Sequence, residues 1–99
     1  MEKDLRYTAL FEIYQGLLTE RQKQIFSDYY LFDLSLGEIA GEDGATRQSV
    51  YDAIKKVKLK LEEFESKLGV YAKTGDVLAC LDGNLEKDVY DKVKEILYR

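Results

Sequence analysis

The chain has 99 residues, of which 45% are hydrophobic and 34% are charged, and its formal net charge at pH 7 is −4. This length suits one small domain with a modest core, and the composition excludes a disordered tail. No apolar run approaches the roughly 20 residues needed to cross a bilayer, so we expect no membrane insertion.

Composition also argues against an enzyme. The chain has no histidine, which is the commonest general base and metal ligand, and it has no phosphate-binding G-x-x-x-x-G-K-[ST] loop. The single cysteine, Cys80, has neither a disulfide partner nor an imidazole partner, and we expect it to be buried as a small apolar residue. The start of the chain lacks the basic-then-apolar form of a signal peptide. We therefore expect a cytoplasmic protein with no catalytic activity, cofactor or metal.

Two helices are predicted in the first third of the chain. Residues 3–18 carry more apolar side chains than one helix face needs, and the surplus could pack against a partner subunit or against the C-terminal helices. Residues 20–32 form a second helix, which Thr19 opens as the first residue of a T-x-x-Q capping box. Arg21 and Lys23 lie near its start and could reach a phosphate, because helix N-termini attract anions, but solvent exposure is the simpler interpretation.

A short helix at 35–41, a tight turn and a long helix at 46–68 are predicted next. The S-x-x-E sequence that starts at Ser35 has the form of a capping box. Gly44 can take the left-handed conformation that ends a helix, and Thr46 is a good N-cap for the long helix. Apolar side chains then recur at spacings of four and three on one face of the long helix: Val50, Ile54, Val57, Leu61, Phe64 and Leu68.

The spacing of Ala40, Gly44 and Val50 is typical of a DNA-binding helix-turn-helix, with a small residue, a turn glycine and a buried aliphatic residue. This register places one set of side chains on the outward face of the second helix, where such proteins contact base edges and phosphates: Arg47, Gln48, Tyr51, Asp52 and Lys55.

The segment from Thr46 to Lys60 carries five cations and one anion, a net charge of +4 in a chain whose total is −4. We expect Lys55, Lys56 and Lys58 to neutralise phosphates, although lysines at such positions can also simply solvate an exposed face. Asp52 is unusual there. It could accept a hydrogen bond from a cytosine amino group, or it could fix Arg47 or Lys56 along the helix.

Two further helices are predicted, at about 71–82 and 84–98. Gly69 would end the long helix, Gly83 would end the next one, and Asn84 would cap the last. This C-terminal part could complete the core, form a dimer interface or bind another protein. The predicted organisation is thus a helix-turn-helix domain without a wing at 1–69, followed by a helical extension at 70–99.

The run LTERQKQIFSDYYLFDLSLGEIAGEDGATRQSVYDAIKKVKLKLEEFESKLG, from Leu18 to Gly69, resembles the helix-turn-helix of sigma factor region four and, more closely, the small bacterial YlxM-like proteins. The preceding LFEIYQGLLT extends the resemblance to the second group. The absence of proline and the helical periodicity predict an all-α fold, which we expect to be a five-helix bundle with a long recognition helix. The resemblance implies that this all-helical domain contains a sigma-region-four-like helix-turn-helix. Carried over by motif position, its recognition residues are Thr46, Arg47, Gln48, Tyr51, Asp52 and Lys55.

The resemblance also implies partners. YlxM-like genes lie beside those of the signal recognition particle protein, which suggests an accessory role in protein targeting. The nucleic acid would then be DNA, or RNA of the signal recognition particle, and the particle's protein is a further candidate partner. Because helix-turn-helix proteins usually bind as two-fold dimers, we also expect a homodimer. The alternatives are a DNA-binding transcriptional regulator, and a protein–protein interaction module that uses the helix-turn-helix only as a scaffold.

Overall fold

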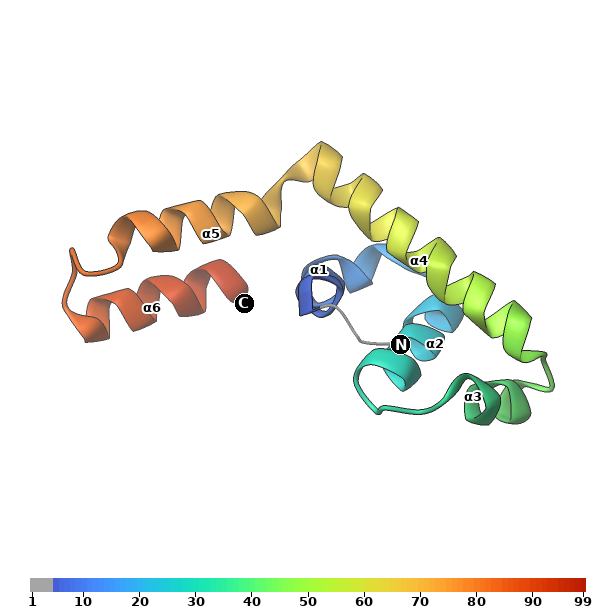
Figure 1. Cartoon of the computed structure of the whole chain (residues 1–99). Helices are drawn as coiled ribbons and strands as arrows, with labels where there is room; N and C mark the ends of the chain where they lie inside the picture. Colours follow the sequence, from blue (N-terminus) through green and yellow to red (C-terminus); the bar gives the residue numbers. More distant parts are fainter. Residues whose placement is uncertain (1–4) are drawn as a thin grey trace.

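The computed structural model describes residues 5–99, and every regular element in that range is a helix (Figure 1). The all-α class is confirmed. The described chain has six α-helices, as many as the ranges predicted in chain order and one more than the five-helix bundle that was expected. Residues 3 and 4 of the first predicted helix lie outside the described range. The elements are α1 (Leu5–Tyr14), the short 3-10 helix η1 (Gln15–Leu17), α2 (Glu20–Tyr30), α3 (Leu36–Asp43), α4 (Arg47–Leu68), α5 (Val70–Leu81) and α6 (Lys87–Tyr98).

Local side-chain chemistry sets where these helices begin and end. The N-cap hydroxyls of α2, α3 and α4 each accept a hydrogen bond from the backbone N–H three residues later, at 3.1 Å. Gly44 and Gly69 follow α3 and α4 with φ angles of 65° and 63°, the left-handed conformation that was predicted for them. The three capping boxes pair Thr19 with Gln22, Ser35 with Glu38, and Thr46 with Ser49.

The hydrophobic core lies between α1, α2, α3 and α4. The apolar stripe of α4 is buried as far as Leu61, whereas Phe64 is only partly buried and Leu68 is 50% exposed. The stripe was therefore predicted one turn too long, because a carboxylate, Glu65, takes the inward position near the end of the helix. The largest fully buried side chains are Phe11, Phe26, Leu10, Ile39, Ile54, Leu61, Val50 and Val57.

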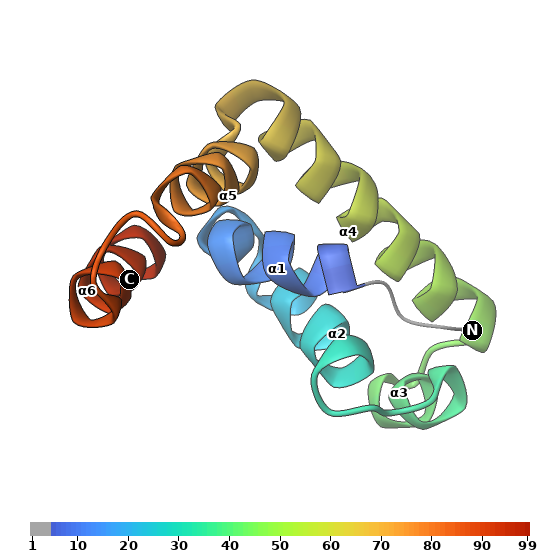
Figure 2. The same ribbon diagram turned by 60° about the vertical axis from the view of Figure 1, so that its left-hand side comes forward.

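The two C-terminal helices form an antiparallel hairpin that extends away from this core (Figures 1 and 2). None of the residues of α6 is buried, and the helix packs mainly against α5. The radius of gyration is 16.3 Å and the extents are 52 × 25 × 23 Å, whereas a compact domain of this length has a radius of about 13 Å. The molecule is therefore not a compact bundle, because the hairpin leaves the body of the protein.

Three predictions about the hairpin were wrong. The last helix begins at Lys87, three residues after the predicted start, and Asn84 does not cap it. The side-chain amide of Asn84 instead donates to the backbone oxygen of Cys80 at 3.0 Å, at the end of α5. Cys80, which was expected to be buried, is exposed, because it lies on the side of α5 that no other described helix covers. In residues 5–99, no helix is both long enough and apolar enough to span a membrane.

Candidate nucleic-acid interface

Helices α3 and α4 and the turn between them form a helix-turn-helix at one end of the molecule, opposite the hairpin (Figures 1 and 2). Ile39, Ala40 and Val50 are buried where the two helices meet α2. The backbone N–H of Ala45 donates to the oxygen of Ala40 at 2.9 Å, which closes the turn after Gly44. The N-terminal half of α4 is thereby held in place by its inner face, and its outer face is left in solvent.

The structure brings most of the predicted contact residues onto this outer face. Tyr51 is 40% exposed, although its ring also borders a groove between α2, α3 and α4. The hydroxyl of Thr46 is used in capping, because it accepts from the N–H of Ser49. The residues that are exposed are Thr46, Arg47, Gln48, Tyr51, Asp52, Lys55 and Lys56.

Lys58 is the exception among the predicted residues. It points toward α1 and α2, where its Nζ lies 5.2 Å from the ring centre of Tyr7 and 5.5 Å from that of Tyr30. Burial acts to lower the pKa of Lys58, but the Tyr30 hydroxyl and the other nearby tyrosines outweigh it, and the pKa is raised. The ammonium group is therefore kept charged against the aromatic faces, and it stabilises the packing of α4 on the body.

Asp52 has a partner that differs from both residues suggested by the sequence. Its Oδ1 accepts from Nε2 of Gln48 at 3.0 Å, one helical turn away, and within the described chain it forms no bond to Arg47 or Lys56. The pair fixes the carboxamide of Gln48 along the helix. The acceptor capacity that remains on Asp52 faces solvent.

Arg47 lies against the first turn of α3. A groove of about 560 Å³ lies beside Arg47 and is bounded by the start of α3, the start of α4 and two tyrosine rings. A larger groove, of about 760 Å³, lies elsewhere on the molecule. Within residues 5–99, Arg47 forms no hydrogen bond or ion pair. No group in that range therefore competes for its guanidinium donors. The residues that line the groove are Tyr29, Ser35, Leu36, Gly37, Arg47 and Tyr51.

The two cations at the start of α2 are paired with carboxylates. Nη2 of Arg21 lies 3.7 Å from Oδ2 of Asp43, and Nζ of Lys23 lies 3.0 Å from Oε1 of Glu20. Asp43 is the last residue of α3, so its ion pair with Arg21 links the end of α3 to the start of α2. Both cations are thus engaged within the fold, and their reach toward a phosphate is reduced.

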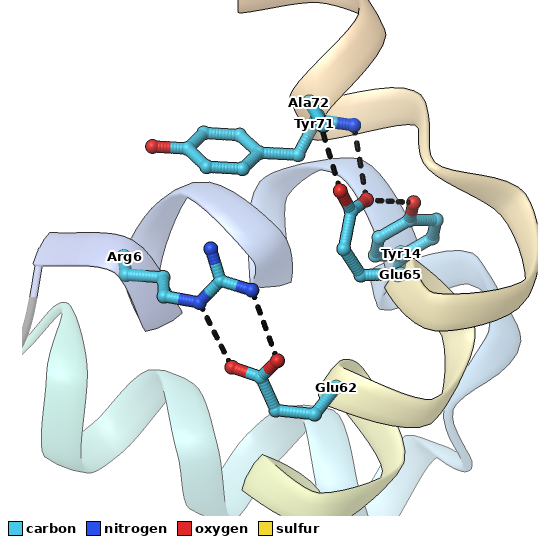
Figure 3. A network of polar contacts seen from close by, with 6 residues as sticks. All are labelled: Arg6, Tyr14, Glu62, Glu65, Tyr71 and Ala72. Atoms are coloured by element: carbon cyan, nitrogen blue, oxygen red, sulfur yellow. Dashed lines mark hydrogen bonds and ion pairs between the residues drawn. The ribbon is translucent and has the colours of Figure 1, made fainter.

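A buried polar network at the α4–α5 corner was missed by the sequence analysis (Figure 3). Gly69 has no side chain with which to cap α5, and the carboxylate of Glu65 does so instead: it accepts from the N–H groups of Tyr71 and Ala72, both at 3.0 Å. Tyr14 of α1 donates its hydroxyl proton to Glu65 and accepts from the N–H of Val70 at 3.1 Å. The network fixes the direction in which the hairpin leaves the body.

The pKa values of the network follow from these bonds. Burial acts to raise the pKa of the Glu65 carboxyl, but the bonds from Tyr14 and from the two backbone N–H groups outweigh it, and the pKa is lowered. Burial and the bond to Glu65 raise the pKa of Tyr14. Glu62 lies one turn before Glu65 in α4, and its carboxylate accepts two hydrogen bonds of 2.9 Å from the guanidinium of Arg6 in α1 (Figure 3). These bonds lower the pKa of Glu62.

The arrangement of α3 and α4 defines a helix-turn-helix protein. A family model described as "Putative helix-turn-helix protein, YlxM / p13 like" matches residues 1–98. The chain belongs to this family, UPF0122, as the resemblance of its central run predicted. The description names a structural motif and no reaction.

Relatives from several bacteria support this membership. The chain is 53% identical over 73 residues to a UPF0122 protein of Halalkalibacterium halodurans, and the match covers 74% of this chain and 67% of that protein. It is 43% identical over 96 residues to one of Bacillus velezensis, covering 97% and 79%. A third, from Bacillus thuringiensis, is 54% identical over 68 residues, covering 69% and 62%. The matched segments thus span between 62% and 79% of these relatives.

Proposed function

We propose that the outer face of the first half of α4 binds nucleic acid. In this mode Arg47 and Gln48 donate to base edges or phosphates, Tyr51 makes an apolar or stacking contact, and Lys55 and Lys56 neutralise phosphates. The Thr46 hydroxyl keeps its capping role, and Lys58 holds α4 on the body. The family's helix-turn-helix description is consistent with this class of function.

The distribution of ion pairs supports this proposal. In the body of the protein, Arg6, Arg21, Lys23 and Lys67 each lie within 4 Å of a carboxylate. Among residues 5–99, the cations without such a partner lie in two places: Arg47, Lys55, Lys56, Lys58 and Lys60 on α4, and Lys73, Lys87, Lys92, Lys94 and Arg99 in the hairpin. The first group lies on the second helix of the helix-turn-helix. Unpaired cations at the exposed end of a helix-turn-helix are available to phosphates, while the acidic remainder of the chain repels nucleic acid from other faces.

Titrating the purified chain into a labelled DNA duplex and a labelled RNA hairpin, at several salt concentrations, tests the proposal. We expect Arg47→Ala and Lys55→Ala each to weaken binding. On duplex DNA, each should also reduce the salt slope by about 0.9 for every phosphate that the variant no longer neutralises. Lys92→Ala is the matched control, because it removes an exposed cation from α6. Unchanged affinity in both α4 variants would overturn the assignment.

We further propose that this nucleic-acid binding serves the signal recognition particle pathway in the cytoplasm, with the particle's RNA or protein as partner. The resemblance to YlxM-like proteins supports this step. Crosslinking the protein in cells and sequencing the bound nucleic acid tests it. Enrichment of the particle's RNA is the expected result, whereas discrete DNA sites would make the protein a transcriptional regulator.

We also propose that the chain forms a homodimer and that the hairpin provides the dimer interface. A groove of about 760 Å³ lies between it and α1. Tyr98, which lines this groove, and Ile96, on the same helix, are apolar side chains that are 49% and 57% exposed. Sedimentation equilibrium should then show a dimer that Ile96→Lys dissociates. Glu95→Lys, the adjacent exposed position, should leave the dimer intact. A wild-type chain that sediments as a monomer at all concentrations would refute this assembly.

A further inference from the structure

Gly37, the second residue of α3, lies unusually close to the side chain of Arg47. A Cβ atom built at Gly37 would be 3.0 Å from Nε, 3.2 Å from Nη2 and 3.4 Å from Cζ of Arg47. The guanidinium therefore occupies the space that a side chain at position 37 would take. A Cβ built at Gly41, in the same helix, meets no atom within 4 Å. The close approach is thus specific to Gly37.

The backbone does not require glycine at position 37. The residue is helical, and it is absent from the positive-φ glycines of the described chain, which are Gly44, Gly69 and Gly83. Glycine inside a helix is unfavourable compared with alanine, because it loses more conformational freedom on folding. The contact with Arg47 gives a physical reason for glycine at this position.

We propose that Gly37 is a positioning residue for Arg47: it lets the guanidinium rest on the first turn of α3, so that its donors meet a pair of acceptor atoms on nucleic acid. The inference rests on the proposed nucleic-acid binding and identifies what orients one of its contacts. The acceptors are two oxygens of a phosphate or the O6 and N7 atoms of a guanine, both of which match the fork of an arginine.

Positioning matters here because a long side chain loses rotamer freedom when it binds. A guanidinium that packs against the first turn of α3, with no competing carboxylate among residues 5–99, loses less freedom on binding than one surrounded by solvent, and its planar fork is presented in fewer directions. An added methyl group at position 37 would push the guanidinium away. The shift costs the fold little, since the atoms that must move are at the end of a flexible side chain.

The test compares Gly37→Ala with Gly41→Ala in the full chain. Both substitutions add the same methyl group to α3, so both variants should melt at or above the wild-type temperature. With the labelled DNA duplex and RNA hairpin as probes, Gly37→Ala should weaken binding by about two- to tenfold, the range expected for failing to pre-order one such side chain. Gly41→Ala should bind as the wild type does.

A double-mutant cycle separates positioning from a general structural effect. In the Arg47→Ala background, Gly37→Ala should cause no further loss of affinity. In the wild-type background, Arg47→Lys should weaken binding, because it keeps the charge and loses the fork. The Nε–H resonance of Arg47 in a nitrogen-15 spectrum should shift in Gly37→Ala and stay in place in Gly41→Ala.

Two results would overturn the inference: equal affinity of Gly37→Ala and Gly41→Ala, or a loss in Gly37→Ala that persists without Arg47. Failure of the wild-type chain to bind either probe is a different outcome, since it overturns the proposed function and the positioning role with it. If Gly37→Ala loses the same affinity on the DNA duplex and on duplexes of scrambled sequence, and its salt slope is also lower, the acceptor is a phosphate. A loss confined to one sequence identifies a guanine edge.

Discussion

Replacing Glu65 with alanine should destabilise the protein far more than replacing a glutamate in the same half of α4 whose side chain is exposed. The Glu65 carboxylate accepts three hydrogen bonds, from the Tyr14 hydroxyl and from the N–H groups of Tyr71 and Ala72. The side chain is buried, so water does not replace all of these bonds when it is removed.

The magnitude follows from the surroundings of each donor. Tyr14 is buried, and its hydroxyl would keep the bond from Val70 but lose its acceptor, which costs about 1–3 kcal/mol. The N–H groups of Tyr71 and Ala72 lie in the first turn of a helix in partly open positions, so losing their cap costs about 1 kcal/mol. Together these give about 2–4 kcal/mol, a large share of the roughly 5–15 kcal/mol that is typical of a domain.

Urea unfolding monitored by circular dichroism measures this loss, and hydrogen exchange at Tyr71 and Ala72 shows where it arises. Glu63→Ala is the matched control, because Glu63 is exposed and its ion pair is with Lys67, at 3.0 Å, for which about 0.5 kcal/mol is expected. Equal destabilisation by the two substitutions would refute the claim that the Glu65 carboxylate fixes the corner.

Three further predictions follow from particular contacts. Lys58→Met should lower the free energy of unfolding by about 1 kcal/mol in the same urea assay, because the charge over two tyrosine rings is lost, and should reduce nucleic-acid affinity less than Lys55→Met does. The unfolding free energy, measured as a function of pH, should fall as the pH drops below about 4.5. The pKa of the Glu65 carboxyl is lowered in the folded state from its ordinary 4.5, so the stability that the ionised carboxylate contributes is complete above that pH and is lost when the carboxylate is protonated. Cys80 should react with a thiol reagent in the native protein at nearly its rate in denaturant, and strong protection would contradict its exposure.

Much of the fold was predictable because its signals are local. Capping boxes join residues three apart, and the left-handed glycines end helices through their own backbone. The same locality explains the error at Asn84. An asparagine in a tight turn can bond to the helix before it or after it, and only the path of the chain decides that it binds Cys80.

The contacts that position the hairpin were not predictable, because they join distant parts of the chain. Tyr14 and Glu65 are 51 positions apart in sequence. In sequence, Glu65 belongs to the acidic second half of the long helix, whose pattern indicates packing, but nothing nearby shows that its carboxylate will cap the following helix across Gly69. The register of α4 did predict which side chains face solvent, but it could not show that Lys58 meets Tyr7 and Tyr30.

The change of charge along α4 is best explained by the fold itself. Its first half carries cations without partners among the described residues, whereas Glu62 and Glu65 in its second half hold α1 and α5. The carboxylates are needed there as acceptors, irrespective of any ligand. In the proposed binding mode, the phosphates lie along the first half of the helix, where the unpaired cations are. The same helix can therefore orient the ligand toward its free end and anchor the hairpin at the other.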